Sequence, residues 1–384
     1  MATAFPAPVK PEVRTQAIPE ARVMAPGAGR LAALDGMRFL AALAVVGFHY
    51  VGLIPTSFEK MWGESPDDLF TRTNKVFAFG RLGVDFFFII SGFVIAMSAW
   101  GRTPREFFIS RVSRLYPMYW VAVLLTASVL YFQPLHGWNP DLHAVFANLT
   151  MLQKPLGVTA VDSVYWSLWP ELCFYVMFSV VVWKGVTYRR VVLFCGMWMF
   201  VSVVARTVDL PVLTLVVNPV YAPFFIAGIA FHLMWRFRPT PMLWGIVGMS
   251  FLMASYYFTA PNIRLNEKSW GPGDGWLMLT LFVMFGLVGA VALGWTSRIR
   301  WKWLTTAGAM TFPLYLIHGH IGAVLITHFR DKADPWVVFL SVVAFMVVAA
   351  YVFQRFVERP MARRMRVALT RGRFLSEPPR RFPS

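Results

Sequence analysis

The sequence predicts an all-α, polytopic integral membrane protein with about ten transmembrane helices and both termini in the cytoplasm. Of its 384 residues, 57% are hydrophobic and only 14% are charged, whereas soluble domains contain about 25% charged residues. The mean hydropathy is +0.56. Apolar runs long enough to cross a bilayer recur along the chain, with basic segments between them. This composition excludes a soluble enzyme and a disordered chain. A disulfide-rich secreted domain is also excluded, because the two cysteines, Cys173 and Cys195, both lie in apolar runs.

A helix needs about 20 apolar residues to cross about 30 Å of hydrocarbon. Runs of about that length predict ten spans, at residues 36–54, 79–99, 115–132, 165–183, 190–206, 219–235, 241–260, 275–295, 306–328 and 335–357. The fifth, sixth and seventh are the least regular part of the series, because Pro211, Pro219 and Pro223 lie within or between these runs.

The basic residues predict the orientation of these spans. With the N-terminus inside, 26 of the 36 Lys and Arg residues fall on inner segments and nine fall on outer loops, as the positive-inside rule requires. The net charge of +17 is therefore explained by topology, and no nucleic-acid partner is expected.

The two ends of the chain are predicted to lie outside the membrane domain. Residues 1–33 are rich in Pro and Ala and lack an amphipathic period, which predicts a disordered cytoplasmic tail. We expect no cleaved signal peptide, because the first apolar run starts only near Gly36. Residues 34–360 are the predicted transmembrane domain, and residues 361–384 are a predicted basic cytoplasmic tail.

An ionisable side chain inside a span is costly and by default indicates a functional site. Arg38 and His49 are eleven residues apart, which is three helical turns, so both fall on one face roughly 16 Å apart. Arg38 then lies at the inner surface, and His49 lies toward the outer half. A structural histidine with an ordinary snorkelling arginine explains the spacing equally well.

Three further ionisable residues lie in the second and fourth spans. Glu171 lies one or two turns into its span, just after Pro170, and a carboxylate at that depth needs a partner. Arg81 and Asp85 are four residues apart, which favours a self-neutralising structural pair over a catalytic one.

Polar positions in the second and ninth spans complete the set of candidates. Tyr315 lies one turn before His318 on the same face, whereas His320 and His232 are interpreted as structural. The pair Ser91 and Gly92 is more typical of a close helix contact than of chemistry.

Arg111 and Arg114 belong to a cluster of arginines at the inner surface and would share a helical face. Such a cluster suits a ligand with several phosphates. Lipid headgroups and the positive-inside rule explain it equally well.

Together these motifs resemble the integral-membrane acyltransferase family 3, which includes bacterial O-antigen and exopolysaccharide O-acetyltransferases. The resemblance extends from about Leu34 to Pro360 and lies in the order of its short motifs. They are Leu34-Asp35-Gly36-Met37-Arg38 with His49, Gly83-Val84-Asp85-Phe86-Phe87-Phe88 running into Ser91-Gly92-Phe93, Arg111-Val112-Ser113-Arg114-Leu115-Tyr116-Pro117, Trp166-Ser167-Leu168 with Glu171 and Phe174-Tyr175, Tyr315-Leu316-Ile317-His318, and Phe356-Val357-Glu358-Arg359-Pro360. Phe39 departs from the pattern, since Gly is commoner there. Because the chain ends soon after the tenth span, we expect it to lack the esterase-like domain of some members.

The resemblance implies transfer of an acyl group, by preference acetyl, from cytoplasmic acyl-CoA to a hydroxyl of an exported or cell-surface carbohydrate. It implies a multi-pass protein of the bacterial inner membrane with no tightly bound cofactor. No metal is expected, because no set of His, Asp and Glu residues has the spacing of metal ligands. His49 is the predicted general base and Glu171 the carboxylate that orients it. Side chains predicted to bind the donor are Arg38, Arg111, Arg114 and Tyr116, and those predicted to support the site are Asp35, Arg81, Asp85, Ser91, Tyr315 and His318.

One alternative function, a transporter, remains open at the level of sequence, and a scaffold is disfavoured. A proton-coupled transporter would use Asp85, Glu171 and the histidines as a relay, and it predicts internal repeats with paired broken helices. A scaffold has no reason to keep ionisable groups in the membrane. Within the acyltransferase hypothesis, direct transfer and a covalent acyl-histidine are both compatible with the sequence, as are acetyl and larger acyl groups.

Overall fold

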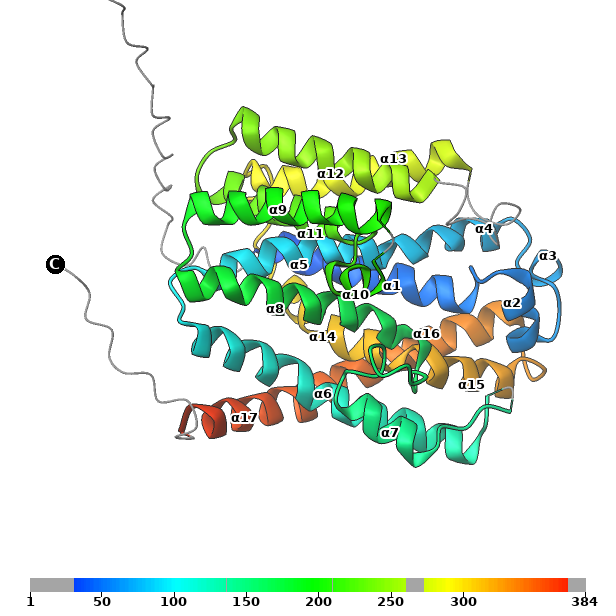
Figure 1. The fold of residues 1–384 in the computed structure, drawn as a ribbon. Helices are drawn as coiled ribbons and strands as arrows, with labels where there is room; N and C mark the ends of the chain where they lie inside the picture. The colour runs from blue at the N-terminus through cyan, green and yellow to red at the C-terminus, as the bar shows by residue number, and fades with distance from the viewer. Residues whose placement is uncertain (1–30, 136, 209, 260–272, 372–384) are drawn as a thin grey trace, which may run out of the picture.

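A computed structural model describes residues 31–371, apart from residues 136, 209 and 260–272, as an all-helical bundle (Figure 1). Its long helices are α1 (Ala32–Tyr50), α5 (Gly83–Ala99), α6 (Pro104–Phe132), α8 (Leu168–Lys184), α9 (Tyr188–Thr207), α11 (Ala222–Arg236), α12 (Pro241–Thr259), α13 (Asp274–Ala292), α14 (Lys302–Ile317), α15 (Gly319–Phe329) and α16 (Pro335–Phe353). The shorter elements are α2 (Pro55–Trp62), α3 (Pro66–Leu69), α4 (Thr73–Ala78), η1 (Phe79–Leu82), α7 (Leu142–Leu149), η2 (Ser163–Ser167), α10 (Pro211–Val217), a π-helical turn (Gln354–Glu358) and α17 (Arg359–Arg371).

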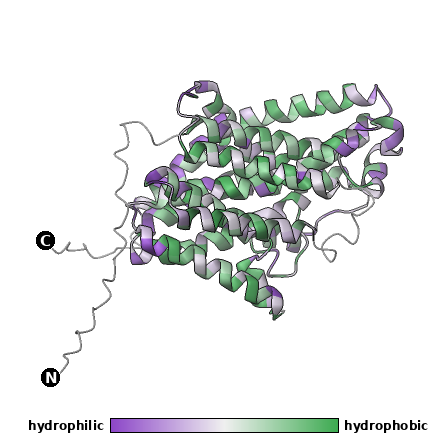
Figure 2. Ribbon diagram, turned by 90° about the horizontal axis from the view of Figure 1, so that it is seen from above, coloured by the Kyte–Doolittle hydropathy of each residue, from purple (hydrophilic) through white to green (hydrophobic). Residues whose placement is uncertain are grey.

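These helices confirm the prediction of a polytopic membrane protein. Among the described residues, nine helical segments are long and apolar enough to cross a membrane, and α14 with α15 makes a bent tenth. Each coincides with one of the ten predicted spans. Apolar residues run along the bundle while hydrophilic ones gather toward its two ends (Figure 2). Large apolar side chains also face outward, as lipid-facing positions require; Phe200 on α9 is 70% exposed.

Three boundaries differ from the prediction. The ninth span is not one straight helix, because α14 and α15 meet at His318 with a bend of 70°. The third begins at Pro104 instead of residue 115, where Thr103 and Glu106 form a capping box. The last continues through the π-helical turn into α17 and ends at Arg371, so residues 361–371 of the predicted tail are helical. Residues 1–30 and 372–384 lie outside the described residues.

One end of the bundle, called here the basic end, is defined by a common set of helix termini. α1 and α6 begin there, and α5 and α16 end there, because Asp35, Ser98, Arg111 and Glu358 all line one cavity. α17 packs along α6 at this end. Arg105 of α6 donates hydrogen bonds to the carbonyl oxygens of Leu369 and Thr370 in α17.

α5 and α11 form the most extensive helix contact of the described chain. Gly92 lies against the carbonyl group of Phe225, and Gly228 lies against the carbonyl group of Ile89, so that a Cβ atom on either glycine would overlap the facing backbone. This confirms the close contact predicted from Ser91-Gly92. The contact fixes α5, which carries Ser91 toward the centre of the bundle.

We predict that Gly228→Ala destabilises the protein, because its methyl group would overlap the Ile89 carbonyl and force α5 and α11 apart. Overpacking of this kind costs about 1–3 kcal/mol. Thermal unfolding in detergent measures the loss as a lower midpoint. Gly248→Ala is the matched control, because it places a methyl group in open space on α12. Equal midpoints for the two variants would contradict the tight contact.

Candidate active site

The break between α14 and α15 brings two histidines together. His318 is fully buried, and it is both the C-cap residue of α14 and the N-cap residue of α15. Its Nε2 lies 3.2 Å from Nδ1 of His49, near the end of α1. The two ring centroids are 5.0 Å apart and the rings meet edge to face. α1 and α14 pack along each other, which holds the two residues side by side.

The hydrogen-bond partners of this pair determine which ring nitrogens carry protons. Nδ1 of His318 lies 2.8 Å from the carbonyl oxygen of Tyr315 and 3.2 Å from that of Leu314. A carbonyl only accepts, so Nδ1 is the donor and Nε2 of the neutral ring is an acceptor. Nδ1 of His49 then donates, because its neighbours are this Nε2 and, at 2.9 Å, the carbonyl oxygen of Val45.

This assignment leaves a lone pair on Nε2 of neutral His49. Among the described residues Nε2 has no hydrogen-bond partner, and the side chain is partly exposed. His49 is therefore arranged as a base whose orientation is held at the opposite nitrogen. The predicted orienting group was Glu171. In the structure the side chain within hydrogen-bond distance of His49 is His318.

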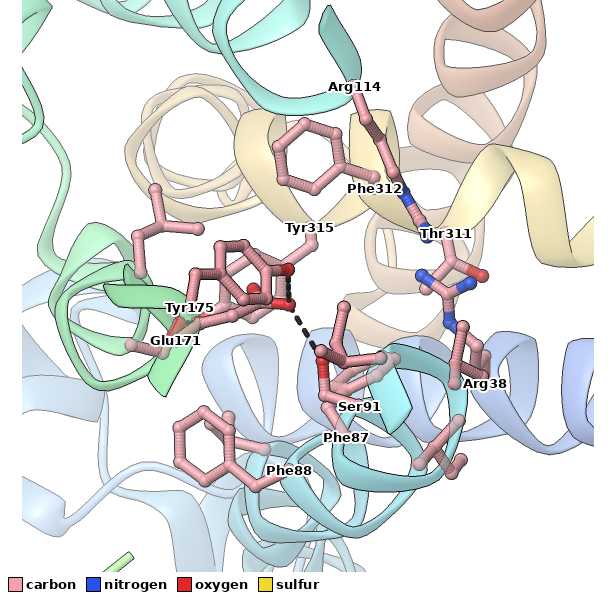
Figure 3. A pocket seen from close by; sticks show the side chains of 16 residues that line it. Arg38, Phe87, Phe88, Ser91, Arg114, Glu171, Tyr175, Thr311, Phe312 and Tyr315 are labelled. Atoms are coloured by element: carbon pink, nitrogen blue, oxygen red, sulfur yellow. Dashed lines mark hydrogen bonds between the residues drawn. The ribbon is translucent and has the colours of Figure 1, made fainter. Parts of the chain in front are cut away.

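Glu171 lies in a cavity between α5, α6, α8 and α14, which we call the Glu171 cavity (Figure 3). Its Oε1 accepts hydrogen bonds from the hydroxyl of Ser91, at 2.7 Å, and from the hydroxyl of Tyr175. Figure 3 shows Arg38 and Arg114 entering from the side opposite Glu171 and Tyr175. A single carboxylate thus faces two guanidinium groups inside the bundle.

A second cavity, called here the arginine cavity, opens at the basic end. Its charged lining residues are Asp35, Arg38, Arg111, Arg114 and Glu358. The two cavities share Arg38, Val94, Arg114 and Phe312, so they are neighbours along one path. The path carries positive charge from the basic end to Glu171.

Arg111 is held more tightly than a snorkelling surface arginine. It is only 7% exposed. Its guanidinium donates to the Ser98 hydroxyl at 3.2 Å and lies over the rings of Phe107, at 5.7 Å, and Tyr175, at 5.8 Å. Burial among aromatic rings positions this charge at the boundary of the arginine cavity.

Tyr315 links the histidine pair to the Glu171 cavity. It lines that cavity, and its ring lies 5.6 Å from the ring of His318. Its hydroxyl is fixed by the Ser167 hydroxyl at 2.6 Å and by the Val164 carbonyl oxygen at 2.8 Å. His49 does not line the Glu171 cavity. Tyr315 therefore borders the Glu171 cavity on one side and His318 on the other, and His318 in turn contacts His49.

Three of the predicted site residues lie away from these groups. The hydroxyl of Tyr116 donates to the Thr150 carbonyl oxygen at 3.1 Å, and Tyr116 lines neither cavity. Arg81 lies in η1 and Asp85 in the first turn of α5. The charge of Arg81 acts on buried Asp85, and neither residue lines the two cavities.

Sequence reasoning assigned no site role to Tyr175, Ser98 or Glu358, which the structure places at the two cavities. Tyr175 had a usable signal, because it lies four residues after Glu171 and so shares its helical face. Glu358 lies in the motif Phe356-Val357-Glu358-Arg359-Pro360, which did not indicate its place at the cavity. Ser98 had no signal, since its neighbours at the cavity come from other helices. His320, interpreted as structural, contacts the Val161 carbonyl oxygen at 3.0 Å through Nδ1.

Comparison with known proteins identifies the family. A family model for the acyltransferase domain matches residues 31–355, which is most of the chain. The chain belongs to the acyltransferase 3 family. The matched region contains both cavities and the histidine pair, apart from Glu358. No solved structure gives a significant match.

Three curated relatives illustrate the range of this family. Acyltransferase MdmB of Streptomyces mycarofaciens is 24% identical over 387 residues, covering 88% of this chain and 94% of that protein. Exopolysaccharide production protein ExoZ of Rhizobium meliloti is 25% identical over 320 residues, covering 77% and 93%. Peptidoglycan O-acetyltransferase OatA of Listeria monocytogenes is 23% identical over 370 residues, covering 85% and 55%.

Proposed function

We propose that the protein transfers an acyl group, by preference acetyl, from acyl-CoA to a hydroxyl of a cell-surface or exported carbohydrate. The observation that carries this proposal is the arrangement of two groups inside one membrane domain. An arginine-lined path leads inward from the basic end. Beyond Tyr315, at the Glu171 end of this path, lies His49, whose Nδ1 is hydrogen-bonded and whose Nε2 is free.

The arginine path suits the donor. CoA carries several phosphates, and guanidinium groups bind phosphate through paired, charge-assisted hydrogen bonds. Arg38, Arg111 and Arg114 supply three such groups at the two cavities. In the orientation predicted from the basic residues, the basic end faces the cytoplasm, where acyl-CoA is available.

His49 suits the chemistry of transfer. In the proposed step Nε2 of His49 takes the proton of the acceptor hydroxyl while the hydroxyl oxygen attacks the thioester carbonyl. The ester C–O bond forms, the C–S bond breaks, and the departing CoA thiolate takes the proton from the imidazolium. Throughout this step Nδ1–H of His49 donates a hydrogen bond to Nε2 of His318, which keeps the ring oriented and supports its charged form.

The names of two relatives support a carbohydrate acceptor in a bacterial membrane. One is an exopolysaccharide production protein and the other a peptidoglycan O-acetyltransferase. We infer that the acceptor of this protein belongs to the same broad class, presented at the outer side of a bacterial inner membrane.

Incubating membranes with acyl-labelled acetyl-CoA tests the proposed function. Label is expected in glycan and is expected to be released by mild alkali, because the product is an ester. A proton-coupled transporter, which would use the same intramembrane groups, leaves glycan unlabelled. Unlabelled glycan with membranes that contain the protein and its native acceptor would contradict the proposal.

We predict that His49→Ala lowers kcat by about 10²–10⁴, which is the contribution of a general base. The variant should still be extracted as a folded protein. His328→Ala is the matched control, because His328 lies near the far end of α15 and its Nε2 contacts Lys332. Wild-type turnover by purified His49→Ala would show that His49 is not the base.

We predict that Arg114→Gln raises the KM for acyl-CoA by about 10- to 100-fold, because it removes a charge-assisted hydrogen bond to phosphate. Arg102→Gln removes an equal charge from the basic end, but Arg102 is exposed and lines neither cavity. Its KM should stay within about twofold of wild type, since exposed charges are screened. Equal effects of the two substitutions would indicate general attraction instead of a built donor site.

A further inference from the structure

The break at His318 leaves backbone groups without their helical partners. In an unbroken helix the N–H of His320 would donate to the carbonyl oxygen of Leu316, four residues earlier. Here the N–H of His320 donates to Oδ2 of Asp162, at 2.8 Å. The Leu316 carbonyl oxygen accepts from the hydroxyl of Tyr165, at 3.3 Å. Two side chains three residues apart thus replace both halves of one helical hydrogen bond.

Asp162 is built into this position. It is fully buried. Its Oδ1 accepts the N–H of Val164, at 3.2 Å, and so caps η2, while Oδ2 caps the start of α15. In the part of the chain that the structure describes, no Lys or Arg forms an ion pair with Asp162. The carboxylate is therefore satisfied by two backbone N–H groups, each at a helix N-terminus.

Gly319 provides independent support for a specific contact. A Cβ atom at residue 319 would overlap the carboxylate of Asp162. The close approach of Asp162 to the break therefore requires glycine immediately after His318. The other side of the break is also fixed, since the hydroxyl of Tyr50 donates to the His318 carbonyl oxygen at 2.8 Å.

We propose that Asp162 is a positioning residue for acyl transfer, which holds the α14–α15 helix broken at His318 and thereby keeps His318 against His49. The inference rests on the proposed function, in which His49 is the base. Without the Asp162 contact, the N–H of His320 would be drawn back to Leu316, and the 70° bend at His318 would be lost. The Nε2 of His318 would then leave Nδ1 of His49.

Kinetics of Asp162→Asn tests this role. An Asn oxygen accepts one of the two N–H groups, and its amide nitrogen faces the other as a second donor. We expect kcat to fall about 10- to 100-fold, which corresponds to one buried hydrogen bond to a charged group. The KM for acyl-CoA should stay within about twofold, because Asp162 lines neither cavity. Asp334→Asn is the matched control, since Asp334 caps α16 at an exposed site.

A double-mutant cycle with His318→Ala separates positioning from a general structural effect. If Asp162 acts through His318, Asp162→Asn causes no further loss of the residual rate in the His318→Ala background. The inference would be overturned if Asp162→Asn lowered kcat in the His318→Ala background by as much as it does in the wild type, or if Asp162→Asn alone had a wild-type kcat.

Should Asp162→Asn not be purified as folded protein, Tyr165→Phe provides the test. It removes the neutral donor to Leu316 and is expected to lower kcat about three- to tenfold without adding to His318→Ala; a wild-type rate or full additivity would overturn the inference.

The His49→Ala variant distinguishes this inference from the proposed function. Wild-type turnover by His49→Ala overturns the proposed function and the role of Asp162 with it. Loss of turnover in His49→Ala together with wild-type kcat in Asp162→Asn overturns the role of Asp162 alone.

Discussion

The hydrogen bond between the rings of His49 and His318 depends on a helix that is broken in the middle of the bundle. A broken helix is costly in a membrane, because water is not available to satisfy the backbone groups that it frees. Here side chains satisfy them: Asp162 takes an N–H, while Tyr165 and Tyr50 donate to carbonyl oxygens. These contacts come from α1 and from the segment that precedes α8. The packing of three distant segments is therefore a condition for the contact between the two histidines.

The same packing divides the site into two parts. The Glu171 and arginine cavities form a charged path from the basic end, and the histidine pair lies on the other side of Tyr315. Tyr315 is fixed at its hydroxyl by Ser167 and Val164 of η2, which lies directly before α8. Because α8 carries Glu171 and Tyr175, the continuous segment η2–α8 positions both the carboxylate of the path and Tyr315, which borders the histidine pair. A shift of α8 would alter both parts together.

Much of the fold could be predicted because membrane insertion is a local property of the sequence. Each span was recognisable from about 20 consecutive residues, and His49, Glu171 and His318 were recognisable from the cost of a polar group within them. Hydropathy does not show whether the helix axis changes direction within an apolar run, however, so the bend at His318 was not predicted. Pro313 lies inside α14 without breaking it, and the break occurs where Asp162, from a distant loop, replaces a helical hydrogen bond. The partner of His49 was missed for the same reason, since 269 residues separate it from His318. Tyr116 was predicted at the donor site because it belongs to the motif that contains Arg111 and Arg114, yet its hydroxyl donates to the Thr150 carbonyl oxygen.

The central claim is that His318 holds the proton of neutral His49 on Nδ1 and leaves Nε2 free to act as the base. Solid-state ¹⁵N NMR of the histidine-labelled protein in lipid measures this directly, with the His49 signals assigned from the spectrum of His49→Gln. The account predicts a protonated Nδ1 and an unprotonated Nε2 for neutral His49, and a weaker preference in His318→Ala, where only the Val45 carbonyl oxygen remains to accept from Nδ1. A neutral His49 with its proton on Nε2 in the wild-type protein would contradict it.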